Sequence, residues 1–184
     1  SFTIPVSSAI LSLGQTTTSY YGLLSNATYY FKVKVSTESD AAYSAVISSA
    51  TPPVMPQALA LAEVNVTSFT AQWSAGNNGP GTVYWTEASL DDSFSINAIS
   101  SGTAVLALYK SLNPNSTYFL RVKTPGFGGQ DSGFTSYAST ITRAYPPGSE
   151  AYPLVSATGL ALVWDDNGNP TGTRYELVVS TAAG

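Results

Sequence analysis

The stretch from Leu112 to Val122 reads LNPNSTYFLRV, and a near copy of it, LLSNATYYFKV, runs from Leu23 to Val33. After the polar start of the stretch, Tyr118, Leu120 and Val122 alternate with residues that would face the other way. Alternation with a period of two is typical of a strand with one buried face. Two copies of such a strand in one chain indicate a repeated β domain.

The two copies are part of an internal repeat that runs through the chain. The motif GTVY at 81–84 recurs as GTRY at 172–175, 91 residues later, and Trp73 recurs as Trp164 at the same distance. A Pro pair precedes the next repeat in both places. The period is about 92 residues, with small loop insertions. A period of this length suits a seven-stranded sandwich, which needs about 100 residues.

These positions resemble the motif pattern of the fibronectin type III family. That family carries a Trp late in its second strand, a Tyr in its third, and an L-x-P-x-T-x-Y run that leads into its sixth. Trp73, Tyr84 and the 112–122 stretch stand at those places. The resemblance covers the whole chain in pieces and departs from the pattern at Ser25, where the other copy has Pro114. It implies an all-β fold of tandem immunoglobulin-like sandwiches.

The resemblance also implies roles for single aromatic residues. Trp73 and Trp164 would fill the space between two sheets. Tyr29 and Tyr118 would be corner tyrosines, with rings in the core and hydroxyls bonded to nearby backbone. The run NPTGTRY at 169–175 looks like the repeats of large bacterial surface proteins.

The repeat divides the chain into one complete domain and two partial ones. Residues 54–146 supply a complete fibronectin type III-like domain. Residues 1–53 supply the C-terminal half of such a domain, and residues 147–184 the N-terminal half of a further one. The two halves together make up 91 residues, which is one period. We therefore expect residues 147–184 to be completed by residues 1–53 of the neighbouring unit.

The two halves leave the middle domain from opposite poles, because an odd number of strands separates its ends. Each half alone leaves an apolar face open, and such faces associate. A continuous array of repeats would cover these faces, and so would a head-to-tail polymer of chains that exchange strands. Both alternatives predict the same inter-unit packing, made by Trp164, Tyr175, Leu177, Tyr29, Phe31 and Val33.

Composition excludes several classes of function. The chain has 7 Lys and Arg, 11 Asp and Glu, no His, no Cys and a formal charge of -4. There is thus no disulfide framework, thiol nucleophile, Ser-His-Asp triad or zinc site of the usual ligands. An acidic chain with few basic residues is a poor match for nucleic-acid binding, and no apolar run is long enough to span a membrane. We expect no enzyme, no cofactor, and no catalytic or metal-binding residue.

One acidic segment has the spacing of a calcium loop. Asp165, Asn167 and Asn169 alternate, and Glu176 follows eleven residues after the first. Pro170 stands where a calcium loop needs Gly, and no helices flank the segment. A polar loop between two strands is the simpler interpretation.

The candidate binding residues are two aromatic side chains outside the predicted core. Trp85 follows the inward Tyr84, so alternation points its ring outward as an interface anchor or under a neighbouring loop. Phe127 lies at the centre of a Gly-rich loop at 124–133, which is either a packing loop or a contact loop. The adjacent Asp91 and Asp92 lack a partner acid or base, which favours a solvated turn.

Three sequons offer candidate glycosylation sites, at Asn26, Asn65 and Asn115. Asn26 and Asn115 are equivalent positions of the repeat. Four basic residues lie on the outward face of the sixth strand and its copy: Lys32, Lys34, Arg121 and Lys123. The ordinary interpretation is that this face is solvated.

The sequence therefore predicts a non-enzymatic, extracellular structural repeat protein of a filament, sheath, stalk or adhesin. Its main partner would be itself, head to tail, with a glycan or surface protein as a further partner. The alternative is a glycan- or protein-binding spacer module of a larger secreted enzyme or adhesin. In that case Trp85 and Phe127 would make the contact.

Overall fold

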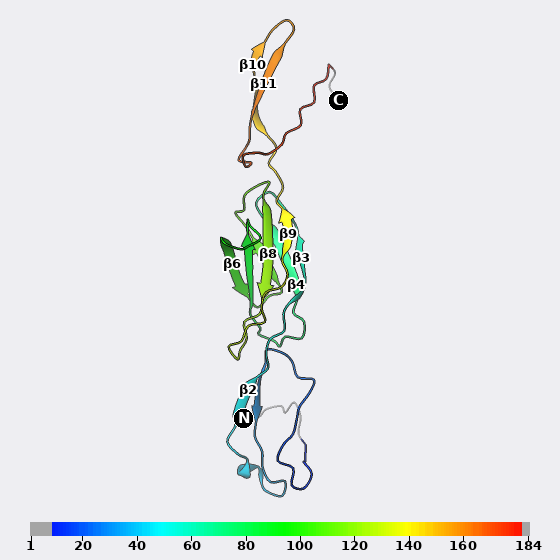
Figure 1. Ribbon diagram of the computed structural model, residues 1–184, viewed down its shortest axis with the longest axis vertical. Helices are drawn as coiled ribbons and strands as arrows, with labels where there is room; N and C mark the ends of the chain where they lie inside the picture. Colours follow the sequence, from blue (N-terminus) through cyan, green and yellow to red (C-terminus); the bar gives the residue numbers. More distant parts are fainter. Residues whose placement is uncertain (1–8, 182–184) are drawn as a thin grey trace.

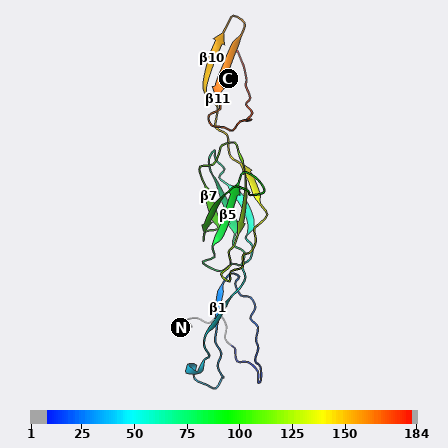
Figure 2. The ribbon, with the colours of Figure 1, turned by 60° about the vertical axis from the view of Figure 1, so that its left-hand side comes forward.

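The computed structural model describes residues 9–181 and shows an all-β chain in three parts along one long axis (Figure 1). A hairpin lies on each side of a central sandwich, as the turned view also shows (Figure 2). Within the described residues the one helical element is a 3-10 turn, η1, at Asp40–Ala42. The strands are β1 (Thr28–Phe31), β2 (Ile47–Ala50), β3 (Gln57–Ala62), β4 (Phe69–Ser74), β5 (Tyr84–Ser89), β6 (Asn97–Gly102), β7 (Leu106–Tyr109), β8 (Thr117–Lys123), β9 (Ala138–Ile141), β10 (Gly148–Val155) and β11 (Leu160–Asp165).

The middle part is a seven-stranded antiparallel sandwich. One sheet has the strand order β3-β4-β7 and the other has the order β6-β5-β8-β9. All strand pairs within the two sheets are antiparallel. This arrangement is that of an immunoglobulin-like sandwich, so the fold class predicted from the repeat is confirmed.

Alternate residues of the strands build the core between the two sheets. In β8 the burial alternates along the whole strand, with Tyr118, Leu120 and Val122 inside. Trp73 on β4 meets Tyr84 on β5 across the core, edge to face, with ring centroids 5.7 Å apart and planes at 63°. Trp73 thus fills the space between the sheets, as the family resemblance implies.

The hydroxyl bonds expected of the two corner tyrosines are present, and the ring of Tyr118 lies in the core while that of Tyr29 is half-buried. Tyr118 accepts a hydrogen bond on its hydroxyl from the backbone N–H of Asn113, at 2.9 Å. Tyr29 accepts the equivalent bond from the N–H of Leu24, at 2.8 Å. The same local structure therefore precedes β8 in the middle domain and β1 in the N-terminal hairpin.

The hairpin β10–β11 repeats the local geometry of the middle domain as well. Trp164 and Tyr175 meet edge to face with centroids 5.7 Å apart and planes at 65°, nearly the values for Trp73 and Tyr84. Among the strands of residues 9–181, however, no second sheet covers this Trp. The aromatic pair thus has nearly the same geometry without a second sheet as with one.

The segments that join the three parts lie between β2 and β3 and between β9 and β10. At the first boundary, Ser25 donates its N–H to Asn77 O at 2.9 Å and accepts the N–H of Gly79 at 2.7 Å. At the second boundary Pro114 and Pro170 stand where Ser25 and Gly79 stand in the first. Proline has no N–H, so this backbone bridge is confined to the first boundary.

Candidate interaction surfaces

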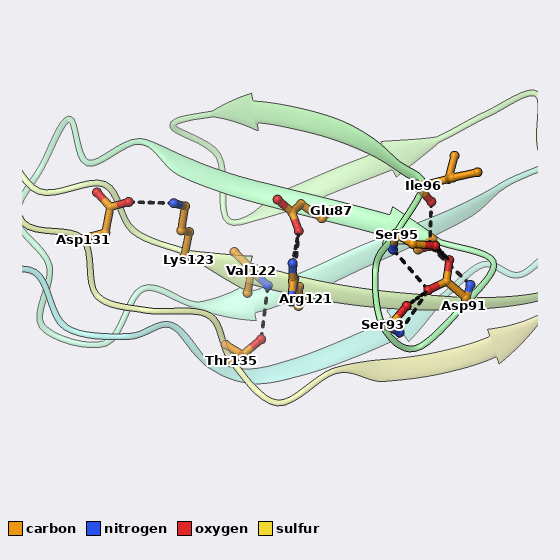
Figure 3. Close-up of polar contacts among 11 residues, drawn as sticks. Glu87, Asp91, Ser93, Ser95, Ile96, Arg121, Val122, Lys123, Asp131 and Thr135 are labelled. Atoms are coloured by element: carbon orange, nitrogen blue, oxygen red, sulfur yellow. Dashed lines mark hydrogen bonds and ion pairs between the residues drawn. The ribbon is translucent and has the colours of Figure 1, made fainter.

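The outer face of the β6-β5-β8-β9 sheet carries a basic side chain between two rings. The Arg121 guanidinium carbon lies 4.1 Å from the ring centroids of both Phe94 and Phe134. Glu87, on the neighbouring strand β5, accepts from the same guanidinium at 2.6 Å (Figure 3). Stacking and ion pairing thus act together on one half-buried side chain.

Lys123, two residues further along β8, has the same kind of environment. Its Nζ lies 4.8 Å from the Trp85 ring centroid and 5.1 Å from that of Phe134. Asp131 pairs with it at 2.6 Å (Figure 3), and this hydrogen bond lowers the pKa of Asp131. Trp85 faces outward as predicted and remains 42% exposed, so Lys123 covers only part of the ring.

The N-terminal hairpin contains a smaller version of this surface. Lys32 and Lys34 place their Nζ atoms 4.0 and 5.2 Å from the Tyr43 ring centroid. Lys34 also pairs with Asp40 at 2.8 Å. Tyr43 and Asp40 lie 91 residues before Phe134 and Asp131.

The interpretation of these four basic residues as a solvated row is therefore wrong. Their amines and guanidinium lie against aromatic rings, and three of them are paired with a carboxylate. Alternation along β8 predicts only that these side chains leave the core. The covering rings come from elsewhere in the chain: Trp85 from β5, Phe94 from the segment before β6, and Phe134 and Tyr43 from segments that follow the basic residues.

Asp91 is the centre of a hydrogen-bonded turn and not half of a catalytic pair. Its carboxylate accepts from the backbone N–H groups of Ser93 and Ser95, at 3.0 and 3.1 Å, and from their hydroxyls (Figure 3). Bonds from Ser93 and then Ser95 hold the pKa of Asp91 well below its usual range. A carboxylate held ionised in this way closes a loop and is a poor proton donor.

The residues with calcium-loop spacing form a turn. Asp165 and Asp166 accept the backbone N–H groups of Asn167 and Gly168, at 2.7 and 2.9 Å. Asn169 is buried, with its amide bonded to the backbone of Tyr145. In the described part of the chain, no group of three or more His, Cys, Asp or Glu is placed to hold a metal ion.

The loop at 124–133 packs against the N-terminal hairpin. Its Phe127 donates its backbone N–H to Asn26 Oδ1 at 2.8 Å, while the ring is 51% exposed. Asn26 itself is fully buried, so a glycan on its amide nitrogen requires this contact to open. Asn65 is exposed, and its side-chain amide donates to Glu63 O and Ser68 Oγ within its own loop. Glycosylation stays a prediction.

Of the six residues predicted to pack between units, four lie on the two hairpins, and Tyr175 and Leu177 lie in the segment that follows β11. Val33 and Leu177 are 65% and 55% exposed, and Trp164 is 39% exposed. Tyr29, Phe31 and Tyr175 are half-buried. Within residues 9–181, no helix is long and apolar enough to cross a membrane.

No family model and no curated protein matches this sequence. Among solved structures, the chain is similar to the fibronectin type III domain of human fibronectin type III domain containing protein 3. The two share 20% identity over 52% of this chain and 90% of that one, with a TM-score of 0.45.

The chain is also similar to domains d3–d4 of the rat CD45 extracellular region, at 13% identity over 76% of this chain and 77% of that one, with a TM-score of 0.46. It is similar as well to the FN5 domain of Drosophila Lar, at 18% identity over 50% of this chain and 99% of that one, with a TM-score of 0.40. These likenesses concern the fold alone.

Proposed function

We propose that the chain is a non-enzymatic, extracellular structural protein, the unit of a filament, sheath, stalk or adhesin that continues head to tail. Residues 147–184 of one unit form a composite sandwich with residues 1–53 of the next. The unit contributes one complete domain and two halves, so each added unit extends the assembly by two domains.

The observation that carries the proposal is a difference in exposure between equivalent positions. Residues at the core of the middle domain have counterparts in the two terminal parts of the chain that are apolar but open to solvent, which is costly unless another surface covers them. The pairs, with the middle-domain residue first, are Trp73 and Trp164 (6% and 39% exposed), Phe69 and Leu160 (0% and 57%), Ala88 and Val179 (2% and 75%), and Val122 and Val33 (0% and 65%).

The ladders of the middle domain indicate which strands would meet in the composite domain. Phe69 on β4 lies opposite Tyr109 on β7, and the same ladder in the composite domain would pair Leu160 on β11 with Tyr20 of the next unit. Because β7 has its counterpart in residues 17–20, that segment becomes the missing neighbour of β11.

The other sheet supplies a charged pair. Trp85 on β5 lies opposite Lys123 on β8, and the counterparts of these two residues are Glu176 and Lys34. The composite domain therefore places a carboxylate opposite an ammonium group across the unit boundary, a favourable cross-strand pair. The charged pair and the apolar pair thus favour the same register between the strands of the two units.

Sedimentation velocity over a range of concentrations tests the proposal. We expect the purified chain to form end-to-end species whose size grows with concentration. Trp164→Ala should weaken this association, while Trp85→Ala, on the outer face of the middle domain, should leave it unchanged. A wild-type chain that stays monomeric at every concentration contradicts the proposal. The intact mass of the native polypeptide distinguishes separate chains of 19.2 kDa from a continuous array.

The partly exposed Trp85 ring favours a second candidate function, a spacer that binds a glycan or a protein. In the composite domain Glu176 takes the place of Trp85, so only every second domain would carry the ring. Binding to a polysaccharide or surface protein that is lost in Trp85→Ala and kept in Trp164→Ala would identify this function.

A further inference from the structure

Both domain boundaries contain the same bridge between an asparagine amide and the backbone. At the first boundary Val54 N donates to Asn78 Oδ1 at 2.9 Å, and Asn78 Nδ2 donates to Val54 O at 2.8 Å. At the second, Tyr145 and Asn169 make the same two bonds at 2.9 and 2.8 Å. The second pair lies 91 positions after the first, so the repeat preserves this asparagine bridge at both domain boundaries.

A second asparagine reaches across each boundary from the preceding domain. Asn26 Nδ2 donates to Thr82 Oγ1 at 3.3 Å, and Asn115 Nδ2 donates to Thr173 Oγ1 at 3.0 Å. The two asparagines have backbone φ values of 48° and 42°, in the left-handed region that Asn tolerates better than most residues. We call this Asn–Thr contact, with the backbone conformation that presents it, the latch.

The latch at Asn26 is closed by a third element, the loop at 124–133 between β8 and β9. Asn26 Nδ2 also donates to Pro125 O at 3.2 Å, and Phe127 N donates to Asn26 Oδ1 at 2.8 Å. The side chain is 0% exposed. The amide of Asn26 is therefore bonded on both its nitrogen and its oxygen.

At Asn115 the contact with Thr173 is present, but the described residues include no loop that closes over the amide. Among the residues that the structure describes, Thr173 is the one hydrogen-bond partner of the Asn115 amide, and the side chain is half-buried. The loop that would close it belongs to the composite domain, where the counterparts of β8 and β9 are β1 and β2. That loop includes residues 35–39.

The loop at residues 35–39 has the turn that this role needs. Glu38 N donates to Val35 O at 3.0 Å, as Gly129 N donates to Gly126 O at 2.9 Å in the loop that closes over Asn26. The two turns lie 91 positions apart. The loop at residues 35–39 therefore shares the backbone turn of the loop that bonds to Asn26.

We propose that Asn115 recognises a second copy of the chain, whose loop at residues 35–39 closes over the Asn115 amide as the loop at 124–133 closes over Asn26. A backbone N–H of that loop donates to Asn115 Oδ1, and a backbone carbonyl accepts from Asn115 Nδ2. This inference rests on the proposed head-to-tail completion, because the loop reaches Asn115 only when the next unit supplies β1 and β2.

The variant Asn115→Gly tests the latch, because glycine keeps the positive φ and removes the amide. Two lost hydrogen bonds should weaken self-association of the full chain roughly ten- to thirtyfold. Hydrogen exchange at residues 35–39 should be slow in assembled wild type and faster in assembled Asn115→Gly, at concentrations that restore assembly. The control is Ser111→Gly, which introduces glycine at an exposed residue that also has a positive φ, 57°.

Two outcomes would overturn the inference in different ways. If Asn115→Gly associates and exchanges like Ser111→Gly, the latch is wrong while the head-to-tail completion stands. If the wild-type chain shows no self-association, the completion fails and the latch fails with it. Circular dichroism checks that the middle domain is folded. If Asn115→Gly is unfolded, Asn115→Asp provides the same comparison, because it keeps the side-chain size and loses the amide donor.

Discussion

Trp73 and Trp164 occupy equivalent positions, contact equivalent tyrosines and differ in what covers them. The first lies between two sheets, while the second lies on a two-stranded hairpin with more than a third of its surface exposed. The free-energy contribution of each ring therefore depends on the presence of the opposite sheet. For Trp73, the opposite sheet belongs to the same domain.

The substitution Trp73→Ala should lower the free energy of unfolding of the middle domain by roughly 3–5 kcal/mol, since it removes a buried aromatic side chain and leaves a cavity. Trp164→Ala should change that free energy little. Guanidinium unfolding followed by circular dichroism measures both. Equal losses in the two variants would contradict the assignment of Trp164 to a separate, composite domain.

Tyr109 offers a test at alkaline pH. Burial raises the pKa of Tyr109 to about 12, against a smaller opposite effect of its 2.6 Å hydrogen bond with Thr86. The folded state thus favours the neutral phenol, whereas the unfolded chain ionises near pH 10. The resulting stability is complete below pH 10 and falls as the pH rises towards 12, by roughly 2–3 kcal/mol.

The matched substitution is Tyr109→Phe. This variant should lose less stability between pH 10 and 12 than the wild type does, because its phenyl ring cannot ionise. The exposed Tyr137→Phe is the control and should keep the wild-type slope. Unfolding titrations at several pH values give the comparison, and parallel slopes for all three proteins would show that Tyr109 does not couple folding to pH.

At the scale of the elements, strand β8 shows what the sequence could and could not predict. The period of two identifies Tyr118, Leu120 and Val122 as the buried face, because alternation is a local property of the backbone. The environment of Arg121 depends on its register with β5 and on a ring at position 134. These are long-range properties that a local pattern does not contain.

The repeat could have supplied part of this information. Basic residues, an aromatic residue and an aspartate recur together in both copies, and three-dimensional contact is one reason for such recurrence. The boundary asparagines recur in the same way, but the sequons at Asn26 and Asn115 suggested only candidate glycosylation sites and no packing role. What they bond to lies in loops far away in the sequence.

The outer face of β8 gives a prediction at this scale. Arg121→Ala should destabilise the middle domain by about 1–2 kcal/mol, because it removes two ring contacts and the bond to Glu87. Arg121→Lys should restore only part of the loss, since lysine lacks the planar group that stacks between Phe94 and Phe134. Thermal unfolding of the three proteins measures the effect. Full rescue by Lys would mean that charge alone matters.

At the scale of the whole molecule, the middle domain is the part with a complete core. Residues 54–146, expressed alone, should form a monomeric sandwich that unfolds in one cooperative transition. Residues 147–184 alone should stay unfolded, since a lone two-stranded hairpin is marginal in water. Circular dichroism and sedimentation velocity test both fragments. A 54–146 fragment without a thermal transition would show the domain limits to be wrong.

The two prolines at the second boundary have a mechanical consequence. The bridge that Ser25 makes with Asn77 and Gly79 resists bending at the first boundary, and Pro114 and Pro170 leave the second boundary without it. A long assembly would thus alternate stiff and compliant joints. Under a sideways force its curvature should concentrate at every second joint. Bend positions traced along single particles in electron micrographs should therefore be spaced by two domain lengths, and evenly distributed bends would contradict this.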